Sequence, residues 1–207
     1  VRDAIGRLIE RGVKFVQFLS GQEKLPTADF VGVDNYAAGA TAAKIIGRFV
    51  GRKAGKVLIV AETMQSLDSI QRRFGFDDVV NSQFPHLQCL PSVETHGDER
   101  RATQILQRVL ENNQEVAAIY VLSSEARIPL EGAASLTDLQ KITVVVHERT
   151  PFSERGLRDA SIDAVIAQDP GHAVRSAIRI MRARTDFREP HAAQDKIRIE
   201  VLLKENL

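Results

Sequence analysis

The segment that decides the fold is Lys56–Phe76, KVLIVAETMQSLDSIQRRFGF. It opens with Lys56–Ala61, a short apolar run rich in β-branched residues, which predicts a buried strand. A polar break follows, and Ser66 can then cap a helix. The predicted inner face of this helix holds Leu67, Ile70 and Phe74. A buried strand leading into a helix is the repeating unit of a parallel α/β sheet.

Asp68 and Arg72 are four residues apart in this predicted helix, so they share one of its faces. That face lies near the strand–helix turn, and open α/β sheets bind ligands at the carboxyl ends of their strands. A guanidinium group offers five fixed donors, which suits the hydroxyls of a sugar or the oxygens of an acid. Two interpretations stay open: Arg72 belongs to a ligand site, or it forms a surface ion pair with Asp68 that contributes about 0.3–0.5 kcal/mol.

Strands and helices alternate over most of the remaining chain. Apolar runs predict strands at 13–19, 30–34, 87–93, 117–122, 142–146, 164–167 and 197–203. Helical periodicity predicts helices at 1–11, 35–50, 98–113, 128–139, 151–158 and 170–185. Only the first two strands have no helix between them. Short strands joined by helical crossovers predict an α/β fold with parallel sheets.

The composition is that of an ordinary globular protein. The chain has 207 residues, 43% of them hydrophobic, and its 28 Lys+Arg nearly balance its 27 Asp+Glu. This balance gives no reason to expect that this chain itself binds nucleic acid or a membrane. Cys89 is the single cysteine, so an intrachain disulfide is impossible, which fits a reducing cytosol. No apolar run approaches the roughly 18 residues of a membrane span.

Sequence motifs for catalysis and cofactor binding are missing. The chain contains no GxGxxG, no GxxxxGK[ST] and no GxSxG, so neither a phosphate loop nor a nucleophile elbow is predicted. The five histidines are scattered, and His86 and Cys89 lack a second pair that would complete a metal site. We therefore predict no enzyme, no cofactor and no metal. An enzyme on an α/β scaffold stays the remote alternative.

Polar residues recur at the carboxyl ends of the predicted strands. They are Ser20, Asp34, Asn35, Asp68, Arg72, Ser123–Glu125, His147–Glu148 and Gln168–Asp169. A sugar hydroxyl both donates and accepts hydrogen bonds, so a polyol site needs acids, amides, hydroxyls and a cationic donor. Each residue alone is more often a cap or a loop residue. Their recurrence at one edge of a sheet predicts a ligand site there.

Five segments, in this order, carry a resemblance to a known family. They are VGVDNYAAGATAA (31–43), KVLIV (56–60) with RRFGF (72–76), VVVHE (144–148), AVIAQDP (164–170) and IRIEVLLKENL (197–207). The chain resembles the effector-binding region of the lactose/galactose repressor family, which is similar to type I periplasmic sugar-binding proteins. The HERT stretch resembles a subgroup in which HELT replaces the usual GFD.

The resemblance implies a two-lobed α/β fold, in which each lobe is a parallel sheet flanked by helices and the ligand binds between the lobes. We predict an N-terminal lobe of residues 1–53 and 168–190, incomplete at its start, and a C-terminal lobe of residues 54–167 and 196–207. The expected crossings between the lobes lie near Gly51–Lys56, near Ile166–Gln168 and in Pro190–Lys196.

The resemblance also implies a set of site residues. The arginine of the family's RxxGF contacts the sugar, and Arg72 matches it. Glu148 stands in the place of the acid of GFD, one methylene longer, and Gln168 matches the glutamine of QDP. Ser20 lies near a position that often holds a ligand-contacting acid. The strand-end pattern adds Asp68 and Ser123. These six residues are the predicted ligand-binding set.

The function implied by the resemblance is the sensor region of a cytoplasmic transcription regulator. A small polar effector, expected to be a sugar, would bind between the lobes and couple their closure to DNA binding by a homodimer. DNA would be bound through a headpiece that this chain does not contain, and no membrane is involved. We expect the chain to be a fragment that lacks this headpiece and a first strand. The alternative is a periplasmic solute-binding protein of a sugar transporter.

Overall fold

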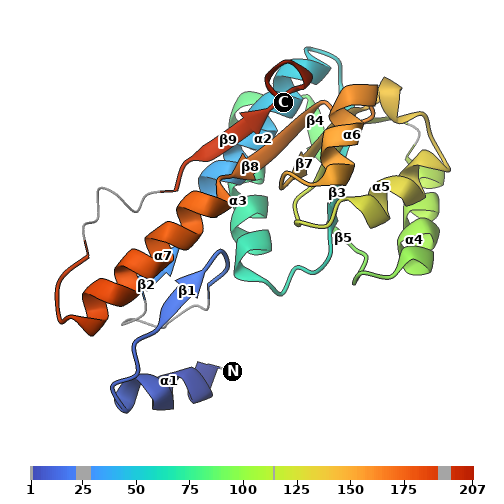
Figure 1. The fold of residues 1–207 in the computed structure, drawn as a ribbon. Helices are drawn as coiled ribbons and strands as arrows, with labels where there is room; N and C mark the ends of the chain where they lie inside the picture. The colour runs from blue at the N-terminus through green and yellow to red at the C-terminus, as the bar shows by residue number, and fades with distance from the viewer. Residues whose placement is uncertain (1, 22–28, 114, 191–196) are drawn as a thin grey trace. The chain divides into compact units, whose positions relative to one another are not determined.

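The computed structural model describes residues 2–21, 29–113, 115–190 and 197–207. The chain forms two compact units, shown together as a ribbon in Figure 1. Unit 1 consists of Val1–Asp34 and Gln168–Ile199, and unit 2 consists of Asn35–Ala167 and Glu200–Leu207. The predicted α/β class is confirmed, because both units combine parallel strands with helices.

The larger sheet lies mainly in unit 2. Its strands are β3 (Gly55–Ala61), β4 (Leu87–Cys89), β5 (Val93–Glu94), β6 (Val116–Val121), β7 (Thr143–His147), β8 (Ala164–Gln168) and β9 (Ile199–Leu202). The hydrogen-bonded order is β4-β3-β6-β7-β8-β9, with β5 also beside β3, and the pairs from β4 and β5 through β8 are parallel. Parallel pairing brings the carboxyl ends of β3, β6 and β7 to one edge.

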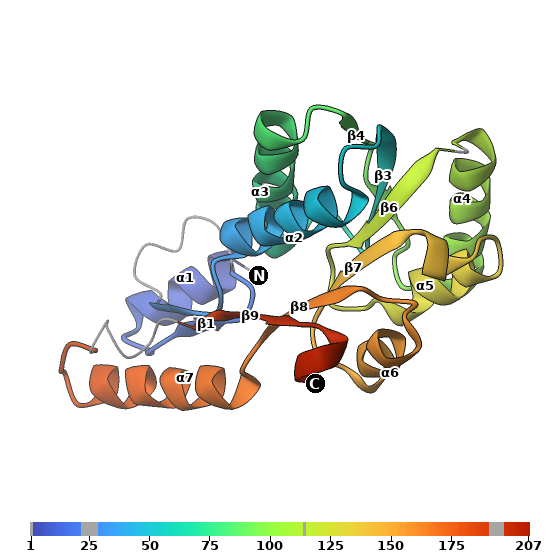
Figure 2. The same ribbon diagram turned by 90° about the horizontal axis from the view of Figure 1, so that it is seen from above.

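Helices cover both faces of this sheet. Figure 2 shows α2 (Asn35–Val50) and α3 (Leu67–Gln83) on one side of β3, β6 and β7, and α4 (Glu99–Asn112), α5 (Arg127–Ala134) and α6 (Pro151–Asp159) on the other. The central strands are buried on both faces, which explains their continuous apolar sequences. Short 3-10 helices lie at Leu139–Lys141, before β7, and at Lys204–Asn206.

Alternate residues of each strand pack against different helices, because neighbouring side chains point to opposite faces. Leu58, Ile119 and Val144 point into the main apolar cluster, together with Leu106 of α4 and Leu157 of α6. The next residue of each strand points to the α2–α3 side, where the β6 residue Tyr120 stacks on Phe76 of α3.

The close packing of α2 on α3 depends on two glycines. A Cβ atom added at Gly39 would lie 1.9 Å from the carbonyl oxygen of Arg72, and one added at Gly75 would lie 2.0 Å from that of Tyr36. The two backbones therefore touch directly, and no larger residue fits at either position. This contact fixes how α3 is rotated about its own axis.

The predicted inner face of α3 is wrong. Phe74, which was expected to be inside, is 63% exposed. The buried residues of α3 are instead Ser69, Arg72, Gly75, Phe76 and Val80. Gly75 must face α2. This requirement turns Arg72 and Phe76, which are four residues apart, toward the sheet.

Two of the predicted helix caps, Asp98 and Asp169, are confirmed. Asp98 accepts a hydrogen bond from the backbone N–H of Arg101 at 2.9 Å, and Asp169 accepts one from that of His172 at 2.9 Å. Ser66 is the N-cap residue of α3, but its hydroxyl lies 2.8 Å from the hydroxyl of Ser69 and does not cap the backbone. Several predicted elements were too long. The strand at 87–93 is split into β4 and β5, and the helix at 128–139 ends at Ala134. The strands predicted at 13–19, 30–34 and 197–203 cover only Val16–Phe18, Asp29–Val31 and Ile199–Leu202.

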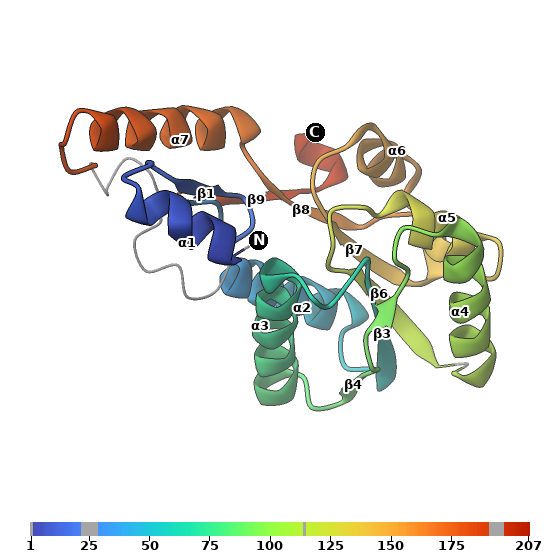
Figure 3. The ribbon, with the colours of Figure 1, turned by 90° about the horizontal axis from the view of Figure 1, so that it is seen from below.

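Unit 1 is built on a pair of parallel strands, β1 (Val16–Phe18) and β2 (Asp29–Val31). The helices α1 (Arg2–Glu10) and α7 (Pro170–Thr185) lie on opposite sides of this pair (Figure 3). A small core joins α7 to the strands through Val31, Val33, Ala173, Ile180 and Ile197. Arg184 of α7 also holds Asp29 of β2 through two hydrogen bonds of 2.8 and 2.9 Å.

The compact units differ from the predicted lobes at α2. The sequence-based division assigned residues 35–53 to the N-terminal lobe, whereas the structure includes α2 in unit 2. The reason is the glycine-mediated contact between α2 and α3, which the sequence pattern did not reveal. The chain therefore passes from unit 1 to unit 2 between Asp34 and Asn35.

The second boundary, between Ala167 and Gln168, falls inside the predicted crossing at Ile166–Gln168. The third lies between Ile199 and Glu200, whereas the predicted crossing at Pro190–Lys196 falls mostly outside the described residues. That the two units are the lobes of a ligand-binding clamp stays a prediction. None of the helices in the described ranges is long and apolar enough to cross a membrane.

Candidate ligand-binding site

Arg72 lies in the first half of α3 and is 4% exposed. Its Nε donates to Oδ1 of Asn35 at 2.9 Å, and its Nη1 donates to the carbonyl oxygen of Leu122 at 2.8 Å. Its Nη2 lies 3.7 Å from Oε1 of Glu148. The guanidinium group thus connects the start of α2, the end of β6 and the residue after β7.

These contacts exclude one of the two interpretations of Arg72, and its membership of a ligand site stays a prediction. The surface interpretation is wrong, because a side chain that is 4% exposed is not a solvated surface group. Two of its nitrogen atoms donate to neutral oxygen atoms, and the third faces a carboxylate whose side chain is 26% exposed. Burying a guanidinium whose charge is not fully neutralised costs free energy unless each of its N–H groups has a hydrogen-bond acceptor. The arrangement therefore fixes the guanidinium and leaves its Nη2 side next to the accessible Glu148.

The backbone around Glu148 is held in an unusual conformation. Glu148 has φ of 66°, the left-handed region that residues other than glycine rarely adopt. Its N–H donates to the carbonyl oxygen of Ile166 at 2.9 Å, and its own carbonyl accepts from the hydroxyl of Ser153 at 2.9 Å. Ser153 also forms a capping box with Thr150 at the start of α6. These bonds hold the strained turn, which directs the Glu148 carboxylate toward Arg72.

A buried aromatic cluster lies on the same side of the sheet as Arg72. The hydroxyl of Tyr120 lies 2.8 Å from Nε2 of His147, and the ring of Phe76 stacks on Tyr120 with centroids 4.5 Å apart. Burial, followed by the charge of Arg72, holds the pKa of His147 well below its ordinary value, so this imidazole is neutral. Burial likewise raises the pKa of Tyr120, so its phenol stays protonated.

Asp68 and Ser123 belong to the same unit as Arg72. Asp68 is half-buried in the first turn of α3. Ser123 is 7% exposed, directly after β6 and Leu122, and its hydroxyl accepts a hydrogen bond from the N–H of Glu62 at 3.0 Å. That bond joins the ends of β6 and β3, so the serine oxygen has a structural role at this edge of the sheet.

Ser20 and Gln168 belong to unit 1. Ser20 is exposed, two residues after β1, and its N–H donates to the carbonyl oxygen of Phe18 at 2.7 Å. Gln168 is the last residue of β8 and is 8% exposed. Their membership of a common site with Arg72 stays a prediction.

Sequence reasoning identified Arg72 and Glu148, which the structure brings together. It noted Asn35 at a strand end but did not select it, although Asn35 anchors Nε of Arg72. It missed Tyr120 and His147 as partners. Alternation alone could have placed these two on the same face of neighbouring strands, but the register of β6 against β7 was needed to bring them within hydrogen-bonding distance.

The arrangement places hydrogen-bond donors beside hydrogen-bond acceptors. Arg72 supplies donors, and Glu148 and Asn35 supply acceptors, which together match the dual character of a hydroxyl group. Within the part of the chain that the structure describes, no group of three or more His, Cys, Asp or Glu residues is arranged to hold a metal ion.

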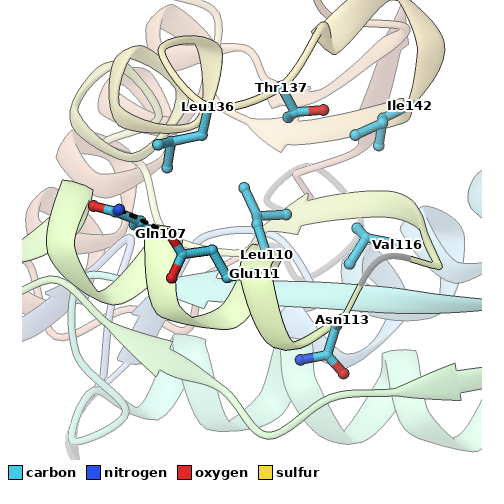
Figure 4. Close-up of a pocket in the computed structure, with 8 residues that line it drawn as sticks. All are labelled: Gln107, Leu110, Glu111, Asn113, Val116, Leu136, Thr137 and Ile142. Carbon is cyan, nitrogen blue, oxygen red and sulfur yellow. Dashed lines mark hydrogen bonds between the residues drawn. The ribbon is translucent and has the colours of Figure 1, made fainter.

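A separate pocket lies at the amino-terminal edge of the sheet, away from these residues. Figure 4 shows it between the end of α4 and the segment that leads into β7. Its volume is about 370 Å³. Leu110 and Val116 are among its aliphatic lining residues, and Gln107, which also lines it, donates a hydrogen bond to Glu111. None of the six predicted site residues lines it.

The fold is shared with solved sugar-binding proteins. The glucose-galactose binding protein GanP from Geobacillus stearothermophilus matches with a TM-score of 0.87 and 20% identity, over 98% of this chain and 72% of that chain. A solute-binding protein of an ABC transporter from Agrobacterium vitis, bound with α-D-tagatopyranose, matches with a TM-score of 0.85 and 20% identity, over 98% of this chain and 70% of that one.

A third structure, a solute-binding protein from Burkholderia graminis C4D1M in complex with D-arabinose, matches with a TM-score of 0.86 and 20% identity, over 99% of this chain and 71% of that one. At these identities the likeness establishes the fold alone. No curated protein sequence matches the chain. A family model, described as a periplasmic binding protein domain, matches residues 1–189. Since this match covers most of the sequence, the chain belongs to the family of periplasmic binding protein domains.

Proposed function

We propose that this chain binds a small neutral sugar or polyol through a site built around Arg72. The observation that carries the proposal is the fixed guanidinium of Arg72, which is buried, held by two neutral acceptors and aligned beside Glu148. A donor next to an acceptor at the carboxyl edge of a parallel sheet is the arrangement that recognises a hydroxyl group.

The charge of the site favours a neutral ligand. Arg72 is already paired with Glu148, and Asp68 lies in the same helix as a second acid. An anionic ligand would have to compete with Glu148 for the guanidinium and would meet a like charge close by. A hydroxyl group can accept from Arg72 and donate to Glu148 without separating the pair. Family membership and the sugar-binding proteins of similar fold support the same ligand class.

Two biological settings fit such a domain. Several proteins of similar fold are solute-binding proteins of ABC transporters, one of them periplasmic, and they favour a transport role. The motif resemblance described above favours the sensor region of a cytoplasmic transcription regulator that is a dimer and binds DNA through another domain. Cell fractionation of the intact protein, followed by gel-shift assays with promoter DNA, separates the two settings.

The ligand is tested by calorimetry with a panel of D-glucose, D-galactose, D-allose, D-arabinose, D-tagatose and the corresponding sugar acids. We expect saturable binding of at least one neutral sugar, and a loss of about 1–3 kcal/mol of binding free energy in Arg72→Lys, because lysine cannot keep the forked contacts. The matched control is Arg108→Lys, on the exposed surface of α4. Binding of sugar acids alone, or an unchanged affinity in Arg72→Lys, contradicts the proposal.

A further inference from the structure

Tyr120 and His147 form a buried polar pair in unit 2. Tyr120 is fully buried and His147 is 2% exposed, and the phenol oxygen lies 2.8 Å from Nε2 of the imidazole. Their ring centroids are 5.6 Å apart. Two polar aromatic side chains buried at this depth cost stability unless they satisfy each other, and an all-apolar pair would fill the same space without that cost.

The position of this pair connects it to Arg72. Tyr120 is two residues before Leu122 in the chain, so both side chains point to the same face of the sheet, and the Leu122 carbonyl accepts from Nη1 of Arg72. Phe76, which stacks on Tyr120, is one helical turn after Arg72 on α3. His147 immediately precedes Glu148, whose carboxylate faces Nη2. The pair therefore adjoins three of the elements that hold the guanidinium group.

We propose that Tyr120 and His147 are positioning residues for Arg72. The two rings form an uncharged packing surface next to the guanidinium. This surface keeps the guanidinium against Asn35 and the Leu122 carbonyl and leaves its Nη2 directed at Glu148. The value of this inference for ligand recognition rests on the function proposed above, but the positioning itself does not depend on any ligand.

An uncharged pair is required for a physical reason. A protonated imidazole at this depth would place a second cation beside Arg72, where both charges are shielded from water. Tyr120 satisfies Nε2 of the imidazole without introducing a charge, whichever of the two groups carries the shared hydrogen. Among the described residues, Arg72 from α3 is the charged group that acts on His147, Tyr120 from β6 is hydrogen-bonded to it, and Glu148 follows it in the chain.

The direct test is nuclear magnetic resonance of the Nε–H of Arg72, assigned by its disappearance in Arg72→Lys. In the unaltered protein we expect one slowly exchanging signal, because this proton is buried and bonded to Asn35. In Tyr120→Phe, which keeps the ring but removes the hydroxyl, exchange should be about tenfold faster, the equivalent of about 1.4 kcal/mol. His147→Phe should give a similar acceleration.

A purely structural role predicts a different result. The control is Val80→Ala, which removes buried volume from the same face of α3 two turns away from Arg72. It should lower the stability of the domain, as core truncations do, without changing the Arg72 signal. The proposal is overturned if Tyr120→Phe and His147→Phe behave like Val80→Ala, that is, if they lower stability and do not change the Arg72 signal.

Acid titration provides a second test, which needs no folded Tyr120 variant. As the pH falls well below 6.5, His147 becomes protonated, and the Arg72 Nε–H signal should shift and exchange faster. This response should persist in Glu148→Gln, which removes the neighbouring carboxylate, and should vanish in His147→Phe. A response that disappears in Glu148→Gln and persists in His147→Phe would assign the effect to the carboxylate and refute the positioning role of His147.

These outcomes separate the two proposals. If no sugar binds but the Arg72 signal responds to Tyr120→Phe, the positioning role holds and the proposed function fails. If a sugar binds and the signal does not respond, the positioning role fails alone. If the unaltered protein shows no protected Arg72 signal, the guanidinium is not held, and the positioning proposal is refuted.

Discussion

Replacing Arg72 with alanine removes the charged group that joins α2, α3 and β6, and we expect a large loss of stability. The truncation leaves Oδ1 of Asn35 and the carbonyl oxygen of Leu122 without their donors, at distances of 2.9 and 2.8 Å in the intact protein. Hydrogen bonds from a charged donor contribute about 1.5–3 kcal/mol each, and the lower end of this range gives about 3 kcal/mol for the two.

The pair with Glu148 adds less. Its atoms are 3.7 Å apart and the carboxylate is partly exposed, so solvent screening limits its contribution to about 1 kcal/mol. Relief of the cost of burying the guanidinium offsets part of the loss. We therefore expect Arg72→Ala to lower the free energy of unfolding by about 3–4 kcal/mol.

The assay is urea unfolding of the chain, followed by circular dichroism, in which the urea midpoints of variants with the same dependence of unfolding free energy on urea are compared. The control is Arg108→Ala, the same chemical change on the exposed face of α4, where we expect a change within about 0.5 kcal/mol. If the two variants unfold at the same urea concentration, the buried network around Arg72 does not contribute as argued.

Other positions give equally specific expectations. Gly39→Ala would place a Cβ atom 1.9 Å from the Arg72 carbonyl oxygen, so we expect a loss of about 3 kcal/mol or more, or no soluble folded protein, in the same unfolding assay. Thr150→Ala removes the hydroxyl that accepts the N–H of Ser153 at the start of α6, so thermal unfolding should show a loss of about 1 kcal/mol. Ala160, at the end of α6, has a left-handed backbone with φ of 62°. Ala160→Gly relieves the strain of this conformation, so the urea midpoint should rise by the equivalent of about 0.5–1 kcal/mol. A fall in that midpoint would contradict the role assigned to its conformation.

The order of strands and helices in this chain follows from local pattern alone. Apolar runs such as Lys56–Ala61 are read from composition, and caps such as Asp98 and Asp169 are read from one side chain and its nearest backbone N–H. These interactions act within a few residues, so the sequence by itself determined the α/β class and most element boundaries. It also indicated that Arg72 stands near the carboxyl end of a strand.

The inner face of α3 needed the tertiary structure. Leu67, Ile70 and Phe74 have the hydrophobic spacing, yet Arg72 and Phe76 face the sheet. The deciding contact joins α3 at Gly75 to the backbone of α2, a helix from another part of the chain. Periodicity within one helix carries no information about such a contact, because it depends on which backbone approaches from outside.

The site shows the same division between local and long-range information. The sequence by itself determined which residues stand at strand ends, among them Arg72 and Glu148. Only the tertiary structure decided that Asn35, 37 residues before Arg72, accepts its Nε–H, and that Tyr120 meets His147 from the neighbouring strand. Strand register and helix packing set these pairs, and both result from the balance of the whole core rather than from any local segment.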